Sequence, residues 1–333
     1  MKIWLIALFL TAPVLAWSAP ETKAEKKDEI EGWEAAAPQR AEESPINWVD
    51  SSHAYATDQA QALTEWMDSF FGDPNYDLEK AESLLRLEWT NSWDEEDDHN
   101  AKLRLRGKLQ LPRVSKRLNL VFSGEDGDEL TEDERSQEDR VGLLYTVAEK
   151  RRSRVDLGLG INTSGLRPGI RYRNQGPITE LYRYRFTQRV QWEDDEGFFT
   201  TGQINLDRAL SDRDLVRWSN RVIYGEESEG AEWRTRLSLN QRRRPLRKKH
   251  QMAVSYFGAI DGVTDPSHTK NYRLGVLVRR QVYRRFLFVE VEPSYNWRRR
   301  EKEDNREGVW AIELRFEIAL ERDLRRMGKR DNE

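Results

Sequence analysis

From about residue 84 to residue 320, apolar and polar residues alternate at every second position. In the segment 101–111, for example, Leu103 and Leu105 alternate with Arg104 and Arg106. Successive side chains of a β-strand point to opposite faces, so each such segment predicts a strand with one apolar and one charged face. Counting these segments predicts about 14 strands, or about 12 if residues 158–173 form no hairpin.

Three features favour a closed barrel in a membrane over a soluble periplasmic β-protein. The segments run about 9–11 residues, which is the length of a tilted membrane-spanning strand. Short basic turns alternate with longer acidic loops along the chain. Aromatic residues flank the acidic loops, as rings do at the level of lipid headgroups; the girdle predicted in this way comprises Trp89, Trp192, Phe198, Tyr224, Trp233, Tyr272, Trp297 and Trp310. We therefore predict an all-β fold, a transmembrane antiparallel up-and-down β-barrel over residues 80–322, followed by a periplasmic tail at 323–333.

This pattern resembles that of bacterial outer-membrane β-barrel proteins, and the length is similar to that of monomeric porin-type channels. The resemblance covers residues 80–322 and rests on no family-specific motif. It implies the outer membrane of a Gram-negative bacterium, with both termini in the periplasm. The partners that it implies are outer-membrane lipid and lipopolysaccharide, and the outer-membrane assembly machinery.

The N-terminal residues predict export. Lys2 precedes an apolar stretch at 3–10, and Ala16 and Ser18 supply small residues for cleavage, so residues 1–18 are expected to be a secretory signal peptide. Residues 19–50 are rich in Ala, Glu, Lys and Pro without periodicity and are expected to be a flexible periplasmic tether. The chain contains no cysteine, which excludes disulfides, thiolate metal sites and a cysteine nucleophile.

A short amphipathic helix is expected at 51–73, before the barrel. Apolar residues recur there at three- and four-residue spacing, namely Ala56, Ala60, Leu63, Met67 and Phe70. Gly72 and Pro74 are expected to end it. One interpretation is a helix that packs against a nearby part of the chain, and the other is a plug or a docking helix that binds a periplasmic partner through residues 52–71.

Composition sharpens this picture. Charged residues make up 34% of the chain and mean hydropathy is −0.87, which fits strands that turn one face to water. Aromatic residues make up 10%, which argues against a disordered chain. The 55 basic and 59 acidic residues nearly cancel, so no nucleic-acid partner is expected.

If the apolar face of each strand meets lipid, the other face lines the barrel interior. On that face bases outnumber acids by about two to one, and isolated buried charges are costly, so we expect a hydrated interior. The pore-lining residues predicted in this way are Arg86, Lys102, Arg104, Arg106, Lys108, Arg173, Arg183, Arg185, Arg189, Arg217, Arg221, Arg234, Arg236, Arg273, Glu232, Glu290 and Glu292. They predict a porin-like passive channel that favours small anionic or polar solutes.

The alternative is a non-conducting structural or assembly barrel, in which cross-strand ion pairs close the interior and the N-terminal helix docks a periplasmic partner. The acidic segment 125–139 leaves two interpretations open as well, a constriction in the pore mouth or a solvated surface loop.

An outer-membrane hydrolase is a third class. Asp97, Asp98 and His99, and separately Asp265 and His268, resemble the carboxylates and Asp–His pair of omptin-type proteases in residue type. The spacing does not match a fixed dyad across strands, and geometry decides before residue type. We therefore expect no enzyme, no catalytic residues, no metal site and no cofactor.

Overall fold

The fold is known from a computed structural model, which describes residues 48–71, 83–96, 98–111, 117–122, 141–162, 165–193, 197–226, 228, 230–243, 250–283 and 286–320. All of these belong to one compact unit, Asn47–Glu333. The predicted signal peptide, nearly all of the predicted tether, the acidic segment 125–139 and the predicted tail 323–333 lie outside the described residues.

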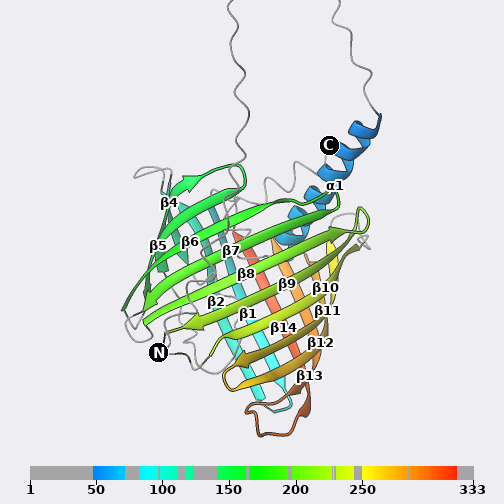
Figure 1. Ribbon diagram of the computed structural model, residues 1–333. Coiled ribbons are helices and arrows are strands. Elements are labelled where there is room, and N and C mark those ends of the chain that lie inside the picture. The colour runs from blue at the N-terminus through cyan, green and yellow to red at the C-terminus, as the bar shows by residue number, and fades with distance from the viewer. Residues whose placement is uncertain are drawn as a thin grey trace, which may run out of the picture. The chain divides into compact units, whose positions relative to one another are not determined.

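The chain forms a closed antiparallel barrel of fourteen strands, which confirms the predicted fold class (Figure 1). Each strand pairs with its neighbours in sequence, and the first pairs with the last. The strands are β1 (Ser83–Asp94), β2 (Asp98–Gln110), β3 (Leu118–Phe122), β4 (Val141–Glu149), β5 (Ser153–Asn162), β6 (Gly165–Pro177), β7 (Tyr182–Glu193), β8 (Gly197–Ala209), β9 (Asp214–Gly225), β10 (Glu232–Arg243), β11 (Met252–Thr264), β12 (Ser267–Gln281), β13 (Leu287–Arg298) and β14 (Glu307–Leu320). Because β5 and β6 form a regular hairpin, the count is fourteen rather than twelve.

Alternation along each strand produces the two faces of the wall. In β2, the register pairs Arg106 with Arg86 and Leu105 with Leu87, so like residues meet on the same face. Leu103 and Leu105 are exposed on the outer face, with 63% and 38% of their surface accessible. An apolar face that remains exposed on a folded protein is typical of a surface that meets lipid or another apolar partner.

Aromatic residues lie on this outer face, close to the hairpin ends that join β1 to β2, β7 to β8, β9 to β10, β11 to β12 and β13 to β14. The register pairs Tyr272 with Trp297, and the Tyr295 ring contacts both Trp297 and Trp310 edge-on, with centroids 4.6 and 4.9 Å apart. Every residue of the predicted girdle is at an outward position, and Trp89, Phe198, Tyr224, Tyr272, Trp297 and Trp310 are exposed.

A single helix among the described residues, α1 (Trp48–Phe71), precedes the barrel and ends immediately before Gly72. Its apolar stripe is buried: Leu63 and Met67 pack with Leu215, and Phe70 packs with Ala253. Leu215 and Ala253 lie at the starts of β9 and β11, so α1 enters the barrel at the end where β8 is joined to β9 and β10 to β11 (Figure 1). No helix of the described part of the chain is long and apolar enough to cross a membrane.

The helix contacts the barrel of the same chain, as the interpretation of a helix that packs against a nearby part of the chain expects. These contacts come from residues 60–71, whose side chains pack against strand residues on the interior face. We call this the lumen face: it is the strand face that carries Ala209, Leu215, Ala253, Phe288 and Ala319, which contact α1.

Candidate functional site

The lumen face carries the charged residues of the strands. Antiparallel partners that lie directly opposite each other point to the same face, so the ladder registers can be followed from strand to strand around the barrel. By this register, all of the residues predicted to line the pore lie on the lumen face. They do not form one cluster. Four lie on β12, β13 and β1, four lie on β6 and β7, and the other nine lie on β2, β9 and β10.

One wall is built from β12, β13, β14 and β1, and its centre is a buried arginine. Arg279 is fully buried, and its Nη1 and Nη2 donate to Glu290 Oε2 at 2.9 Å and to Glu317 Oε1 at 2.8 Å. Arg86 donates to the same oxygen of Glu317 and also to the backbone carbonyl of Ser69 in α1, at 3.3 Å. The wall therefore both neutralises its own charges and supports the last turn of α1.

Further ion pairs extend this wall. Arg315 contacts Glu290 at 3.0 Å and Glu313 at 2.6 Å, and Arg273 contacts Glu292 at 2.5 Å. We call this surface the mixed wall, because it carries both acids and bases. Its bases are Arg86, Arg273, Arg279, Arg298 and Arg315, and its acids are Glu88, Asp94, Glu290, Glu292, Glu307, Glu313 and Glu317. Its acids are more numerous than its bases.

The wall built from β5, β6 and β7 is different. Its lumen face carries Arg154, Arg167, Arg171, Arg173, Arg183, Arg185 and Arg189, with Asp156 and Glu193 as its acids. We call this surface the basic wall. In the closed strand order, β6 and β13 are half a circuit apart. The basic wall therefore faces the mixed wall across the lumen, and β2, which lies beside the mixed wall, carries the further bases Lys102, Arg104, Arg106 and Lys108.

Like charges are direct neighbours in the basic wall. Arg154 is opposite Arg173, and Arg171 is opposite Arg189. Asp156 lies between them: it accepts from Arg154 Nε at 2.7 Å and from Arg171 Nη2 at 3.0 Å. All five side chains are buried. Asp156 thus binds two of these four guanidinium groups directly.

A hollow adjoins these arginines. Gly158 and Gly169 occupy the next lumen-facing row between Leu144 and Gln191, and Gly160 follows on β5. The cavity has a volume of about 110 Å³, and its lining includes the polar residues Arg167, Arg171, Arg189 and Gln191. We call it the glycine pocket. Arg167 also pairs with Glu193.

A second charged cluster holds α1 in the barrel. Asp68 of α1 is fully buried, and its two carboxylate oxygens accept from Arg217 at 2.5 Å and from Arg185 at 3.0 Å. Arg217 also contacts Asp207 at 2.7 Å. Burial alone would raise the pKa of Asp68, but the guanidinium groups of Arg217 and Arg185 more than offset this, so the pKa lies below its ordinary value of 3.8.

Aromatic contacts complete the docking of α1. Trp66 Nε1 donates to Gln251 at 3.2 Å, and the Arg242 guanidinium lies 4.5 Å from the centre of the Trp66 ring. Phe70 meets Phe288 edge-on with 5.9 Å between ring centroids. The helix is therefore fixed by an ion-pair cluster on one side and by rings on the other.

Asp68, Arg167 and Glu193 are among the charged residues that were not predicted from the sequence. Asp68 stands on an otherwise apolar helix stripe, and an acid in that setting signals a buried basic partner. Arg167 and Glu193 lie at the ends of strands that were counted only roughly. The alternation of β6 places Arg167 on the same face as Arg171, so the register alone could have identified it.

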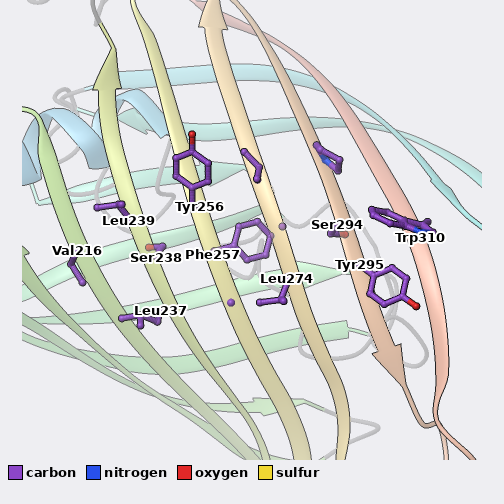
Figure 2. A pocket seen from close by; sticks show the side chains of 14 residues that line it. Val216, Leu237, Ser238, Leu239, Tyr256, Phe257, Leu274, Ser294, Tyr295 and Trp310 are labelled. Carbon is purple, nitrogen blue, oxygen red and sulfur yellow. The ribbon is translucent and has the colours of Figure 1, made fainter.

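A larger hollow lies on the outside of the barrel. It has a volume of about 610 Å³ and an apolar lining, and Figure 2 shows Leu237, Leu239, Tyr256 and Leu274 from neighbouring strands around it. These four residues are at outward positions.

The histidines considered as candidate catalytic residues, His99 and His268, lie in separate hairpins. His99 contacts Asn91 at 2.9 Å, and His268 contacts the backbone carbonyl of Pro266 at 2.8 Å. Their hairpins are not adjacent, because β13 and β14 lie between β12 and β1. Within the part of the chain that the structure describes, no group of three His, Asp or Glu side chains could hold a metal ion.

Comparisons with known proteins find similarity in solved structures alone, since no family model and no curated protein matches the sequence. Pseudomonas putida OprB is similar with a TM-score of 0.45 and 8% identity, over 72% of this chain and 94% of that chain. A bacterial polysaccharide outer membrane secretin gives a TM-score of 0.44 and 9% identity, over 72% and 98%. The KdgM porin in complex with disordered oligogalacturonate gives 0.36 and 6%, over 70% and 98%.

Proposed function

We propose that the chain is an outer-membrane channel that passively passes small anionic or polar solutes. The observation that carries this proposal is the excess of basic over acidic residues at the described positions of the lumen face; the basic wall alone has seven bases against two acids. Charges of one sign cannot be packed densely in a dry interior, because an uncompensated buried ion costs several kcal/mol. Water and mobile anions in the lumen would compensate them.

The width of the barrel supports a hydrated lumen. Barrels of about 8 strands are filled by their own side chains, and barrels of 16 to 18 strands leave an aqueous channel. Fourteen strands fall between these cases, and part of the space is taken by α1. We expect a narrow conduit with weak anion selectivity, in line with pores lined by arginine.

The outer face supports a membrane location. Large apolar side chains remain exposed there, including Leu103, Leu237 and Leu274, with aromatic residues nearer the hairpin ends. On this proposal the barrel end that holds α1 faces the periplasm. The aromatic girdle contacts outer-membrane lipid and lipopolysaccharide. Insertion would depend on the outer-membrane assembly machinery.

Recordings from single molecules of the purified protein in planar bilayers test the channel. Discrete conductance steps with a reversal potential that favours chloride over potassium are expected. The absence of steps would refute conduction, and a reversal potential that favours potassium would refute the anion preference. Heat-modifiable migration of membrane extracts, measured on the same sample, checks that the barrel is folded.

The second candidate is a non-conducting envelope barrel, and the docked position of α1 is the observation that favours it. Deleting residues 48–71 separates the two candidates. A channel narrowed by α1 should show larger conductance steps after the deletion. A barrel that serves only as an anchor for a docking helix should show no steps before or after, and should lose a periplasmic partner that co-purifies with the full chain.

A further inference from the structure

The connections at the two ends of the barrel carry opposite charge. The six connections at the end that holds α1, among them 150–152 and 244–251, contain thirteen bases and two acids. The seven connections at the other end contain six bases and twenty-two acids. Clusters of Lys and Arg beside a membrane attract anionic lipids. The α1 end is therefore the end that suits a leaflet with anionic phospholipid.

One outward arginine at this end lies on a tyrosine ring. Arg208 is directly opposite Tyr182, and both alternate with lumen-facing neighbours, so they share the outer face. The Arg208 guanidinium lies 5.3 Å from the centre of the Tyr182 ring, and both side chains are exposed. A ring contact of this kind holds the face of the guanidinium and leaves the N–H groups at its edge available to a ligand.

Arg152 reaches the same surface from the turn between β4 and β5. This turn is fixed to β6, because the backbone N–H of Gln175 donates to the Arg152 carbonyl at 2.8 Å. Gly176 is directly opposite Tyr184 and faces outward with it. A Cβ atom built at Gly176 would lie 3.3 Å from both Cδ and Nε of Arg152. The arginine side chain therefore crosses the outer face where β6 has no side chain of its own.

Polar groups adjoin the two arginines on the outer face. The Tyr184 hydroxyl donates to Asn174 Oδ1, and Asn174 Nδ2 donates to the Tyr172 hydroxyl at 3.2 Å. Polar side chains are costly in hydrocarbon, whereas tyrosine is enriched at the level of lipid headgroups. On the proposed membrane location, this part of the outer face therefore lies at headgroup level. We call Arg152, Tyr182, Tyr184 and Arg208 the arginine–tyrosine patch.

We propose that the arginine–tyrosine patch binds the phosphate headgroup of an anionic glycerophospholipid, with Arg152 and Arg208 as the donors. The planar guanidinium fork matches phosphate oxygens in a bidentate manner. Among the described residues, neither arginine forms an ion pair that would compete. The acyl chains would lie over the apolar outward pair Phe186 and Ile204, farther along β7 and β8. The site rests on the proposed membrane location and gives the α1 end a preferred class of lipid.

Native mass spectrometry of the full chain tests the patch. The protein is released from a neutral detergent that contains equal amounts of phosphatidylglycerol and phosphatidylcholine, which share the phosphodiester and differ in net charge. We expect the phosphatidylglycerol adduct to be favoured at least tenfold, which is about 1.4 kcal/mol. Arg152→Gln combined with Arg208→Gln should reduce this preference to about twofold or less. Equal retention of the two lipids by the parent chain would overturn the proposal.

Arg243→Gln combined with Arg280→Gln is the matched control. Arg242 is opposite Ala253 on the lumen face, so the next row, Arg243 with Arg280, faces outward at the same end of the barrel but on β10 and β12. The control removes the same charge and should keep the preference within about twofold of that of the parent chain. Equal losses in the two double variants would overturn the patch in favour of diffuse charge at this end.

Calorimetric titration with inorganic phosphate identifies the source of the phosphate group. A lipid site should show no saturable binding of the free ion, because the acyl chains contribute to the affinity. Saturable binding that Arg152→Gln with Arg208→Gln abolishes would overturn the lipid as the ligand. Heat-modifiable migration confirms that each variant is folded before its lipid preference is compared. Conductance steps without a lipid preference would overturn the patch alone, and a lipid preference without steps would support the patch and refute the channel.

Discussion

Replacing Asp68 with Asn should release α1 from the barrel in a measurable fraction of molecules. Leu63, Met67 and Phe70 are buried in the docked helix and together favour docking by about 5–9 kcal/mol, at roughly 1.5–3 kcal/mol each. The ordering of the helix opposes this gain. The Asp68 ion pairs therefore make up a large share of the net docking free energy.

The size of the effect follows from burial. Removing one partner of a buried ion pair costs about 3–5 kcal/mol, because the remaining charge loses its compensation. The lower end of this range applies here, since 13% and 15% of the Arg185 and Arg217 side chains are accessible to solvent. Arg217 also keeps its ion pair with Asp207. A loss of about 3 kcal/mol raises the ratio of undocked to docked molecules about 100-fold.

The chain has no cysteine, so a single introduced thiol reports on docking. Ala60→Cys places the thiol at a position with 3% accessibility, and Ala62→Cys on the exposed side of the helix gives the rate for an open thiol. The ratio of their maleimide reaction rates measures the undocked fraction when the helix recloses quickly. We expect Asp68→Asn to raise this ratio about 100-fold.

Glu65→Gln is the matched control, because it removes the same charge from a half-exposed position of the same helix. Partly exposed pairs contribute at most about 1 kcal/mol, so the ratio should change by about fivefold or less. If Asp68→Asn and Glu65→Gln gave the same ratio, the ion-pair cluster would not be what retains α1.

Two further predictions concern charge inside the barrel. Because the pKa of Asp68 is below 3.8, its contribution to docking is present at neutral pH and is lost as the pH falls through that lowered pKa. A spin label at Ala62→Cys should therefore become mobile below pH 3.8. This transition should be absent in Asp68→Asn. Glu317→Gln removes the carboxylate that the buried Arg86 and Arg279 share, and should destabilise the barrel by about 3–5 kcal/mol. The loss should appear as a lower temperature at which the barrel changes its migration on a gel. Glu307→Gln, at the exposed start of β14, should leave this temperature unchanged.

The strand faces could be predicted from the sequence because their physical basis is local. A side chain two residues away lies on the same face whatever the tertiary context, so the alternation of Leu103 and Leu105 with Arg104 and Arg106 determined both faces of β2. The closed barrel was predicted from strand length and from the alternation of basic and acidic connections. The expected difference in length between them was wrong, because the acidic-side connections after Asn162 and Thr264 are two-residue turns. The hairpin of β5 and β6 was the least certain because three glycines, Gly158, Gly160 and Gly169, weaken its pattern.

The division of the lumen into two walls was not predicted, although the information was present. In an up-and-down barrel the strand order is the sequence order, so β6 and β13 must be half a circuit apart. Pooling all lumen-facing charges into one average concealed that β5–β7 carry seven bases with two acids, whereas most of the described acids lie on the opposite wall. The partners of Asp68 could not be predicted, because they depend on how far α1 enters the barrel.

The two arginine clusters should influence each other. Arg185, which holds Asp68, lies on β7 on the same face as Arg189, so the docked helix supplies a carboxylate to the basic wall. An anion that enters the proposed channel along the basic wall would compete with Asp68 for the same positive potential, and coupling between two ligands is reciprocal. Phosphate should therefore raise the undocked fraction that is reported by Ala60→Cys. Chloride at equal ionic strength controls for screening, which acts less on buried pairs. If phosphate and chloride change the labelling rate equally, docking of α1 is independent of oxyanions in the lumen, and α1 narrows the lumen without responding to what passes through it.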